Sequence, residues 1–307
     1  LGYLAASTEQ IGLASGVLQI PGRTPAMTVM TAAMLDALSH GRFRLGLGIS
    51  NAYITEGWHG TPFGQPLARI REYVSIVRAA LNGHRVQHDG THFQVPLREG
   101  RGEGFELHAN LINKSLPIYL AAVGPRSLQL AGELADGWFG VFCSPARITE
   151  SQEHLRTGRQ RAESTMDGFE VMPSVPIVLH DDLELASAPI RAYVARFLSL
   201  GKRSDNFYYQ LLERLGYGAA AARIQDLMWS GDHAAAAAAV PFEFIDSTAL
   251  LGSSDRIAVG LRAYADAGVT TIALSPFSPD PERRAQALRV AAAAVPVPVD
   301  HIDRNSR

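Results

Sequence analysis

Apolar positions along the chain alternate between short uninterrupted runs and longer stretches with helical spacing. Short apolar runs between turn residues are typical of buried strands, whereas an i, i+3, i+4, i+7 spacing indicates one apolar face of a helix. The clearest helix begins at Thr24-Pro25, a capping residue followed by a proline at the first helical position, and stops before Gly41. The pattern predicts six strands, over 11–18, 43–49, 117–123, 138–143, 169–179 and 270–274. Further helices are predicted at 67–81, 127–135, 145–166, 253–267 and 281–294, with a hairpin over 86–95 around Asp89-Gly90.

Strands separated by single helices predict parallel βαβ units and an α/β fold. Six strands fit either an open doubly wound sheet or an eight-stranded (β/α)8 TIM-type barrel without its first two strands. Residues 1–7 read as the middle of a helix, with no initiator methionine or capping residue before them. We therefore expect that an N-terminal segment is missing, and we favour the barrel, with residues 1–307 as a single domain.

Between residues 181 and 251 the strand signal disappears. Alanine-rich stretches at 218–229 and 233–239 predict helices, and Phe207, Tyr208 and Tyr209 predict an aromatic cluster. The 181–251 segment is predicted to be a helical insertion within the barrel, before its last strand.

Composition narrows the class of protein. The 307 residues carry a formal net charge of −2, with both signs interspersed, which argues against a nucleic-acid or membrane-surface partner. The single cysteine, Cys143, excludes an internal disulfide framework and fits a reducing cytoplasm. No apolar stretch is long enough to span a membrane, no His/Cys/carboxylate spacing suggests a metal, and there is no GxSxG motif of a serine hydrolase. We expect a cytoplasmic protein whose partner is a small molecule.

In parallel barrels the active site lies at the C-terminal ends of the strands. Gly46-x-Gly48 in the second predicted strand indicates either close packing of strand on helix or a flat ring lying against the backbone. The 121–127 segment, AAVGPRS, has small residues that leave room for a ligand, and the start of the following helix favours an anion such as phosphate. Arg126 can add a bidentate contact. The alternative for this segment is a tight strand-to-helix turn.

The segment from Glu56 to Gly60 combines an acid, an aromatic ring and an imidazole in a loop flanked by glycine. His59 is a candidate for a direct role, although a lone histidine is more often structural. Cys143 is predicted to be a packed strand residue and not a nucleophile, because nothing nearby favours a thiolate. Aromatic residues near the barrel mouth suggest a hydrophobic or cyclic substrate, unless they belong to the core: Tyr53, Trp58, Phe142 and Phe277.

Four segments together carry a family resemblance: GVLQIPGRTPAMTVMTAAMLDALSHGRFRLGLGIS (16–50), EGWHG (56–60), PIYLAAVGPRSLQLAGELADGW (117–138) and AGVTTIALSP (267–276). With them the chain resembles the luciferase-like monooxygenase superfamily, specifically its branch that uses a deazaflavin, coenzyme F420. FYYQLLERLGYGAAAARIQDLMWS (207–230) is similar to the helical insertion of that branch. The resemblance covers nearly the whole chain.

The resemblance implies an eight-stranded barrel with the insertion before its last strand, and a homodimer. It also implies a bulge in the third barrel strand, with a non-prolyl cis peptide under the cofactor ring. In this sequence the cis bond would join Gly16 to Val17, with Ser15 beside it. The cofactor phosphate would contact the 121–126 turn. The cofactor-binding residues implied are Ser15, Gly16, Val17, Gly48, Ser50, Ala121, Ala122, Val123, Gly124, Pro125, Arg126 and Ser144.

The chain departs from the family pattern after its fourth barrel strand. Family members often have a glutamate or a Ser-Gly-Pro run there, whereas this chain has Ser50-Asn51-Ala52, so Asn51 can only form hydrogen bonds. Asn51 and His59 are the catalytic candidates that remain. FMN-using members usually place an arginine at this position for the phosphate, and its absence favours the deazaflavin.

The sequence thus predicts an F420-dependent oxidoreductase that transfers a hydride to or from an organic substrate. The alternatives are an FMN-dependent monooxygenase on the same fold, a non-catalytic paralogue that binds the flavin or deazaflavin, and an unrelated barrel enzyme.

Overall fold

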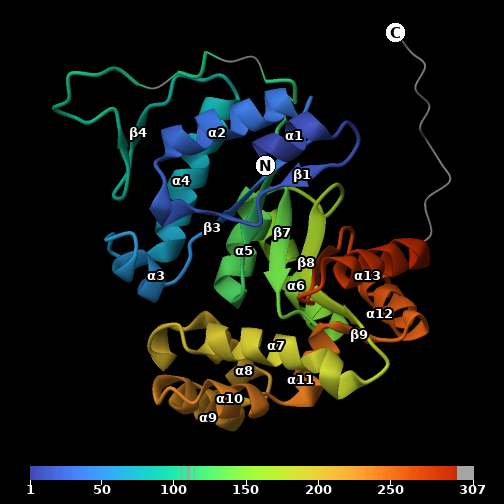
Figure 1. The fold of residues 1–307 in the computed structure, drawn as a ribbon. Coiled ribbons are helices and arrows are strands. Elements are labelled where there is room, and N and C mark those ends of the chain that lie inside the picture. Colours follow the sequence, from blue (N-terminus) through green and yellow to red (C-terminus); the bar gives the residue numbers. More distant parts are fainter. Residues whose placement is uncertain (105, 109–110, 114, 296–307) are drawn as a thin grey trace.

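One parallel sheet organises the computed structural model, which describes residues 1–295 except 105, 109, 110 and 114. Six of its strands follow one another in the order β1-β3-β6-β7-β8-β10, and β2 and β9 pair with β3 and β8. Figure 1 labels β1, β3, β7, β8 and β9 of this sheet. The strand bounds are β1 Leu13–Ala14, β2 Leu18–Gln19, β3 Phe43–Gly48, β6 Ile118–Ala121, β7 Gly137–Val141, β8 Glu170–Leu179, β9 Leu250–Gly252 and β10 Ala273–Pro276.

The spatial order of the strands follows the chain order without a reversal. A doubly wound sheet has a switch point where the order reverses, so the barrel-type winding is the correct alternative of the two predicted. Within the described part of the chain no pairing joins β1 to β10, and the sheet forms a half-barrel. The predicted α/β class with parallel strands is confirmed.

Helices cover the sheet where the apolar spacing predicts them. Thr24 caps α2 by accepting a hydrogen bond from the Met27 N–H at 3.2 Å, as the Thr-Pro signal indicates. Gly132 and Gly158 allow α5 and α6 to pack closely, because a Cβ at either position would collide with a backbone carbonyl of the other helix. The helices that flank the strands are α1 Gly2–Ser7, α2 Pro25–Leu38, α3 Ala52–Gly57, α4 Pro66–Leu81, α5 Pro125–Leu134, α6 Pro145–Arg161, α12 Ser254–Asp266 and α13 Pro281–Ala294.

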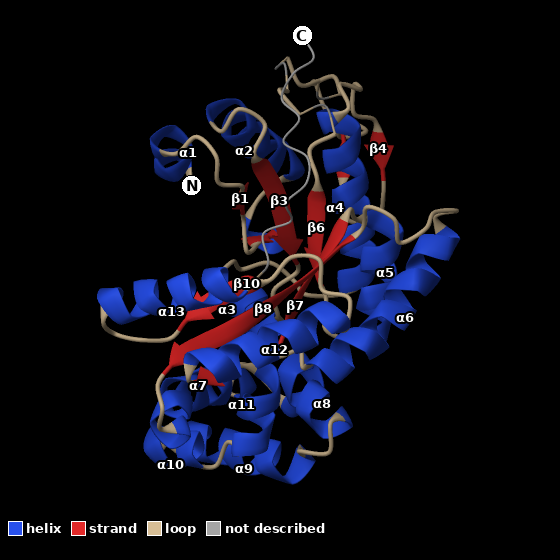
Figure 2. Cartoon of the chain, turned by 90° about the vertical axis from the view of Figure 1, so that its right-hand side faces the viewer, coloured by secondary structure: helices blue, strands red, loops and turns tan. Residues whose placement is uncertain are grey.

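The helices between β8 and β9 form a separate layer beyond the carboxyl ends of the strands, as Figures 1 and 2 both show. They are α7 Leu183–Leu198, α8 Phe207–Arg214, α9 Gly218–Trp229, α10 His233–Ala238 and α11 Phe242–Thr248. They enclose a hydrophobic core of their own, distinct from the one between the sheet and the flanking helices. We refer to these five helices as the insertion.

Several predicted boundaries are wrong. The 11–18 run is two short strands and not one, because the chain bulges between Ala14 and Leu18. The last strand begins at Ala273 and not at 270, and the helix predicted over 145–166 ends at Arg161. The strand β9 was not predicted, since 250–252 lay at the edge of the segment without a strand signal.

The predicted hairpin is confirmed as the antiparallel pair β4 His88–Asp89 and β5 Gln94–Val95. The end of the predicted domain, 296–307, lies outside the described residues.

Candidate active site

A bulge between β1 and β2 forms one side of the site. The peptide bond between Gly16 and Val17 is cis, at the position that the family resemblance implies. The Ser15 hydroxyl fixes the bulge to β3, because its Oγ accepts the Gly46 N–H at 2.9 Å and lies 2.9 Å from the Gly46 carbonyl oxygen. A Cβ at Gly46 would collide with the Ser15 carbonyl oxygen, and one at Gly48 would lie 2.7 Å from Val17 Cγ2. The two glycines of β3 therefore make room for the bulge. The interpretation that Gly46 and Gly48 allow close packing of the strand on a helix is wrong.

The ends of three neighbouring strands continue from this bulge in one row. A Cβ at Gly48, the last residue of β3, would lie 3.5 Å from the Cβ of Ala121 at the end of β6. The Ala122 carbonyl accepts the Trp138 indole N–H at 2.9 Å, which attaches the turn after β6 to β7. The structure thus brings most of the predicted cofactor residues together along one edge: the bulge, Gly48 and the 121–124 segment.

The turn after β6 leads directly into α5, with Gly124 as the residue before its first turn. The Gly124 N–H donates to Ser127 Oγ at 3.1 Å, and Ser127 Oγ donates back to the Gly124 carbonyl at 2.9 Å. Pro125 has no N–H, and the N–H groups of Arg126 and Ser127 have no partner among the residues described. The Arg126 side chain is exposed. This donor set fits a phosphate, because free amides at a helix start attract an anion.

Asn51 lies just after β3, at the start of α3. Its Oδ1 accepts the Ile54 N–H at 2.9 Å, so Asn51 is the N-cap of this helix and only its amide nitrogen is available to a ligand. The residue before it, Ser50, has a left-handed backbone with φ of 66°. Ser50 and Asn51 together turn the chain from the strand into the helix.

His59 lies beside the end of β2, whose last residue Gln19 pairs with Gly48, and beside the turn that follows it. Its Nε2 lies 2.8 Å from Gln19 Oε1, and its ring is packed so closely on Gly22 that a Cβ there would approach to 2.9 Å. The Glu56–Gly60 segment is not wholly a loop, since α3 extends to Gly57. Trp58 is 82% exposed.

A candidate residue that sequence reasoning missed is Arg147, in the first turn of α6. Ser144 caps this helix by accepting the Arg147 N–H at 3.2 Å. The Arg147 side chain is buried, and its Nη2 donates to the Val123 carbonyl at 2.6 Å. The signal was available, because an arginine in a first helical turn opposes the helix dipole and is unfavourable without another reason.

Cys143 is a packed residue, as predicted. Its thiol is buried beside Val141, and burial raises the pKa of the thiol to about 11, although the Arg147 guanidinium opposes the shift. A raised pKa keeps the thiol protonated at neutral pH, so it is not a nucleophile and adds no negative charge to the site.

We expect native Cys143 to react with iodoacetamide at pH 8 about 100-fold more slowly than a free cysteine, because only the thiolate attacks. The rate is measured by mass spectrometry against time, and the control is the same protein unfolded in urea, where the single cysteine should react at the normal rate. Equal rates in the native and unfolded protein would contradict the buried, neutral thiol.

Of the aromatic residues expected near the mouth, Phe142 belongs to the core of the insertion, whereas Phe277 and Tyr53 lie where other segments meet the insertion. Phe142 is buried in the insertion core, with ring centroids 5.6–5.8 Å from those of Tyr193, Phe197, Tyr208 and Phe244. Phe277, after β10, lies 5.1 Å from Tyr193 and is only partly buried. Tyr53 packs on Gly201, and Phe63 lies 6.1 Å from Phe207, so the segment around α3 contacts the insertion across the strand ends.

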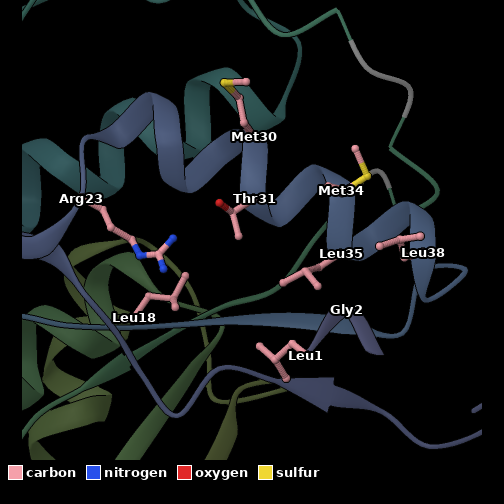
Figure 3. A pocket seen from close by; sticks show the side chains of 9 residues that line it. All are labelled: Leu1, Gly2, Leu18, Arg23, Met30, Thr31, Met34, Leu35 and Leu38. Atoms are coloured by element: carbon pink, nitrogen blue, oxygen red, sulfur yellow. The ribbon is translucent and has the colours of Figure 1, made fainter. Parts of the chain in front are cut away.

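A cavity of about 520 Å³ lies between α1, α2 and β2 (Figure 3). Methionine and leucine side chains line most of it, with Arg23 reaching in beside Leu18 and Thr31. Leu18 is the only residue of this lining next to the bulge, so the cavity borders the site and is not part of the row of strand ends.

Metal and membrane features are not found in the described part of the chain. No group of three or more His, Cys, Asp or Glu side chains is placed to hold a metal ion there. No helix in that part is long and apolar enough to cross a membrane.

Comparison with known proteins shows which proteins this chain is similar to. A Mycobacterium tuberculosis protein, provisionally named a coenzyme F420-dependent oxidoreductase, is 33% identical over 94% of this chain and 85% of its own length. The 5,10-methylenetetrahydromethanopterin reductase of Archaeoglobus fulgidus is 29% identical over 93% of this chain and 83% of its own. The solved coenzyme F420-dependent tetrahydromethanopterin reductase of Methanopyrus kandleri superposes with a TM-score of 0.79 at 23% identity, covering 96% of this chain and 85% of that one, which confirms the fold.

The family model of luciferase-like monooxygenases matches residues 1–271, which is most of the chain. The resemblance inferred from the sequence is confirmed, and the protein belongs to the luciferase-like monooxygenase family.

Proposed function

We propose that this protein is an oxidoreductase that binds coenzyme F420 and transfers a hydride between it and an organic substrate. Two observations from the relatives support the proposal. The M. tuberculosis protein is named as an F420-dependent oxidoreductase, and the A. fulgidus protein is named as a reductase. Both similarities extend over more than nine-tenths of this chain.

The observation that carries the proposal is the turn between β6 and α5. Small residues, Ala121 to Gly124, end a strand at the edge where barrel active sites lie, and two unpartnered amides at the start of α5 lie directly after them. A cofactor with a flat ring and a phosphate needs both features. The residues present therefore fit a phosphate-bearing deazaflavin.

The chain's own residues have four tasks in this proposal. The bulge, Gly48 and Ala121 would hold the ring, and the amides of Arg126 and Ser127 would bind the phosphate. When bound, the deazaflavin supplies a ring carbon that accepts or donates a hydride. Asn51 can orient a substrate through its free amide nitrogen. The insertion, which lies beyond the strand ends, would exclude water from the bound cofactor.

The substrate we propose is a hydrophobic or cyclic molecule, because Tyr193 and Phe277 present partly exposed rings where the insertion meets the end of β10. The homodimer and the cytoplasmic location that the sequence predicts stay predictions.

Titration of the purified protein with coenzyme F420 and, separately, with FMN tests the function, with ligand fluorescence as the readout. We expect F420 to bind with a Kd of about 1 μM or tighter, and FMN at least about tenfold more weakly. A preference for FMN would instead assign the protein to the monooxygenases of the same fold. Tight F420 binding without hydride transfer to any substrate in a screen would favour the non-catalytic paralogue, and binding of neither cofactor would overturn the proposal.

A further inference from the structure

The guanidinium of Arg147 is a buried positive charge without a negative partner. The side chain is 6% exposed, and its Nε is fully buried with no hydrogen-bond partner. Among the residues that the structure describes, no carboxylate lies within 4.0 Å of it. Its Nη2 donates to the Val123 carbonyl, and the guanidinium also lies close to the neutral Cys143 thiol. A buried charge is costly unless it is paired, so this arrangement favours an anion from outside the chain.

The starts of two helices add positive potential around Arg147. The residue is in the first turn of α6, and Val123, to which it donates, immediately precedes the start of α5. The positive ends of two helix dipoles therefore meet at this guanidinium. Cys143 is close by but stays a neutral thiol, since burial raises its pKa to about 11.

A second arginine, Arg214, is exposed at the end of α8 in the insertion. Burial, and next the charge of Arg147, lower the pKa of Arg214 at the end of α8, against the opposing effect of Glu150 and Glu213. The two positive charges act on each other, and Glu150 and Glu213 offset part of that repulsion at Arg214. Cations are expected to be arranged in this way where an anionic ligand completes the site.

We infer that Arg147 is an anion-binding residue of the cofactor site, where its guanidinium and the free amides of α5 bind the phosphate of the cofactor. The inference rests on the proposed function and deepens it, because it assigns the phosphate a fixed positive charge that sequence reasoning did not find. It implies that the protein discriminates between phosphorylated and unphosphorylated forms of the same ring system.

Arg147→Met tests the inference, since methionine keeps an unbranched apolar stem and removes the charge. Two probes are titrated by fluorescence: coenzyme F420, and the deazaflavin with its sugar-alcohol chain but without phosphate. We expect the affinity for F420 to fall about 10- to 100-fold, the range for loss of a charged hydrogen bond, while the affinity for the phosphate-free deazaflavin stays within about twofold. Arg147→Lys should recover part of the loss.

The matched control is Arg156→Met, on the exposed side of the same helix, where Nη2 contacts only Gln152. This variant should bind both probes as the wild type does. Equal loss of both probes in Arg147→Met would show that the residue only supports the fold, and an unchanged F420 affinity would also overturn the inference while leaving the proposed function intact.

If the wild type binds FMN in place of F420, the same variants are titrated with FMN and with riboflavin. The inference then predicts that Arg147→Met loses affinity for FMN and keeps its affinity for riboflavin. If the wild type binds no phosphate-bearing flavin or deazaflavin, the proposed function and the inference both fail.

Discussion

Gly46→Ala is expected to destabilise the protein by at least about 3 kcal/mol, at the upper end of the range for overpacking a core. The added methyl group would collide with the Ser15 carbonyl oxygen and would lie 3.3 Å from Val17 Cγ1. Gly46 pairs with Tyr119 of β6 on its other side, so β3 cannot move away from the bulge without breaking that pairing. The bulge must therefore shift, and with it one side of the candidate cofactor site.

Urea unfolding and F420 titration of the same samples measure this effect. The series Gly57→Ala, Gly48→Ala and Gly46→Ala gives a graded comparison. Gly57 has open space around it and should be nearly neutral, whereas a Cβ at Gly48 meets the Val17 side chain, which can move, and should give an intermediate loss. If Gly46→Ala unfolds at the same urea concentration as Gly57→Ala, the close contact between bulge and strand is not as described.

The pattern of apolar and capping residues was sufficient to predict the helices and strands that residues close together in the sequence stabilise. The helix from Pro25 follows from its cap and its apolar spacing, and β8 from ten residues of largely apolar sequence. The position of the cis bond came from the family resemblance and not from the pattern. Gly46, which packs against this bulge, lies 30 residues after Gly16. No spacing within either segment reveals that the Ser15 carbonyl oxygen comes so close to Gly46.

The features that the sequence did not predict correctly depend on contacts between segments far apart in the chain. Three residues, Leu250 to Gly252, are too few to show a period, and they form β9 only because β8 offers a free edge at 177–179. The predicted cluster of Phe207, Tyr208 and Tyr209 is wrong as a unit, because successive side chains on a helix point about 100° apart. Their rings instead face Phe63, Phe142 and the Arg203 guanidinium.

The sequence predicted only part of the candidate site, because the positions of some of its residues depend on contacts between distant segments. Residues that belong to strand ends, such as Gly48 and Ala121, could be placed because parallel strands bring their carboxyl ends to one edge. His59 was grouped with them by residue type, but its position depends on the path of the chain after α3, which leads it back to Gln19. Arg147 lies in a polar helix, and its place in the first turn was the one sign in the sequence that it is not an ordinary surface residue. Its burial against Val123 shows this directly.

Asn206→Ala is expected to give the second large loss, about 3 kcal/mol, and to lower the melting temperature by roughly 6 °C. Asn206 is 1% exposed and connects the end of α7 to the start of α8. Its Nδ2 donates to the carbonyls of Phe197, Leu198 and Leu200 at 2.9–3.1 Å, and its Oδ1 accepts the N–H groups of Tyr208 and Tyr209 at 2.9 and 3.0 Å. Alanine would leave several of these backbone groups unpaired in a place that water does not reach.

The effect should reach the barrel mouth, because Phe197 and Tyr208, on either side of Asn206, both pack on Phe142 at the end of β7. We expect the 199–206 connection to become the first site of limited proteolysis, and the binding of substrate to weaken more than that of the cofactor phosphate. Asn82→Ala is the matched control, since Asn82 is exposed at the end of α4 and should change the melting temperature by less than about 1 °C. Equal melting temperatures for the two variants would mean that the insertion does not depend on Asn206, and the mouth would then have to be held in place by the aromatic contacts alone.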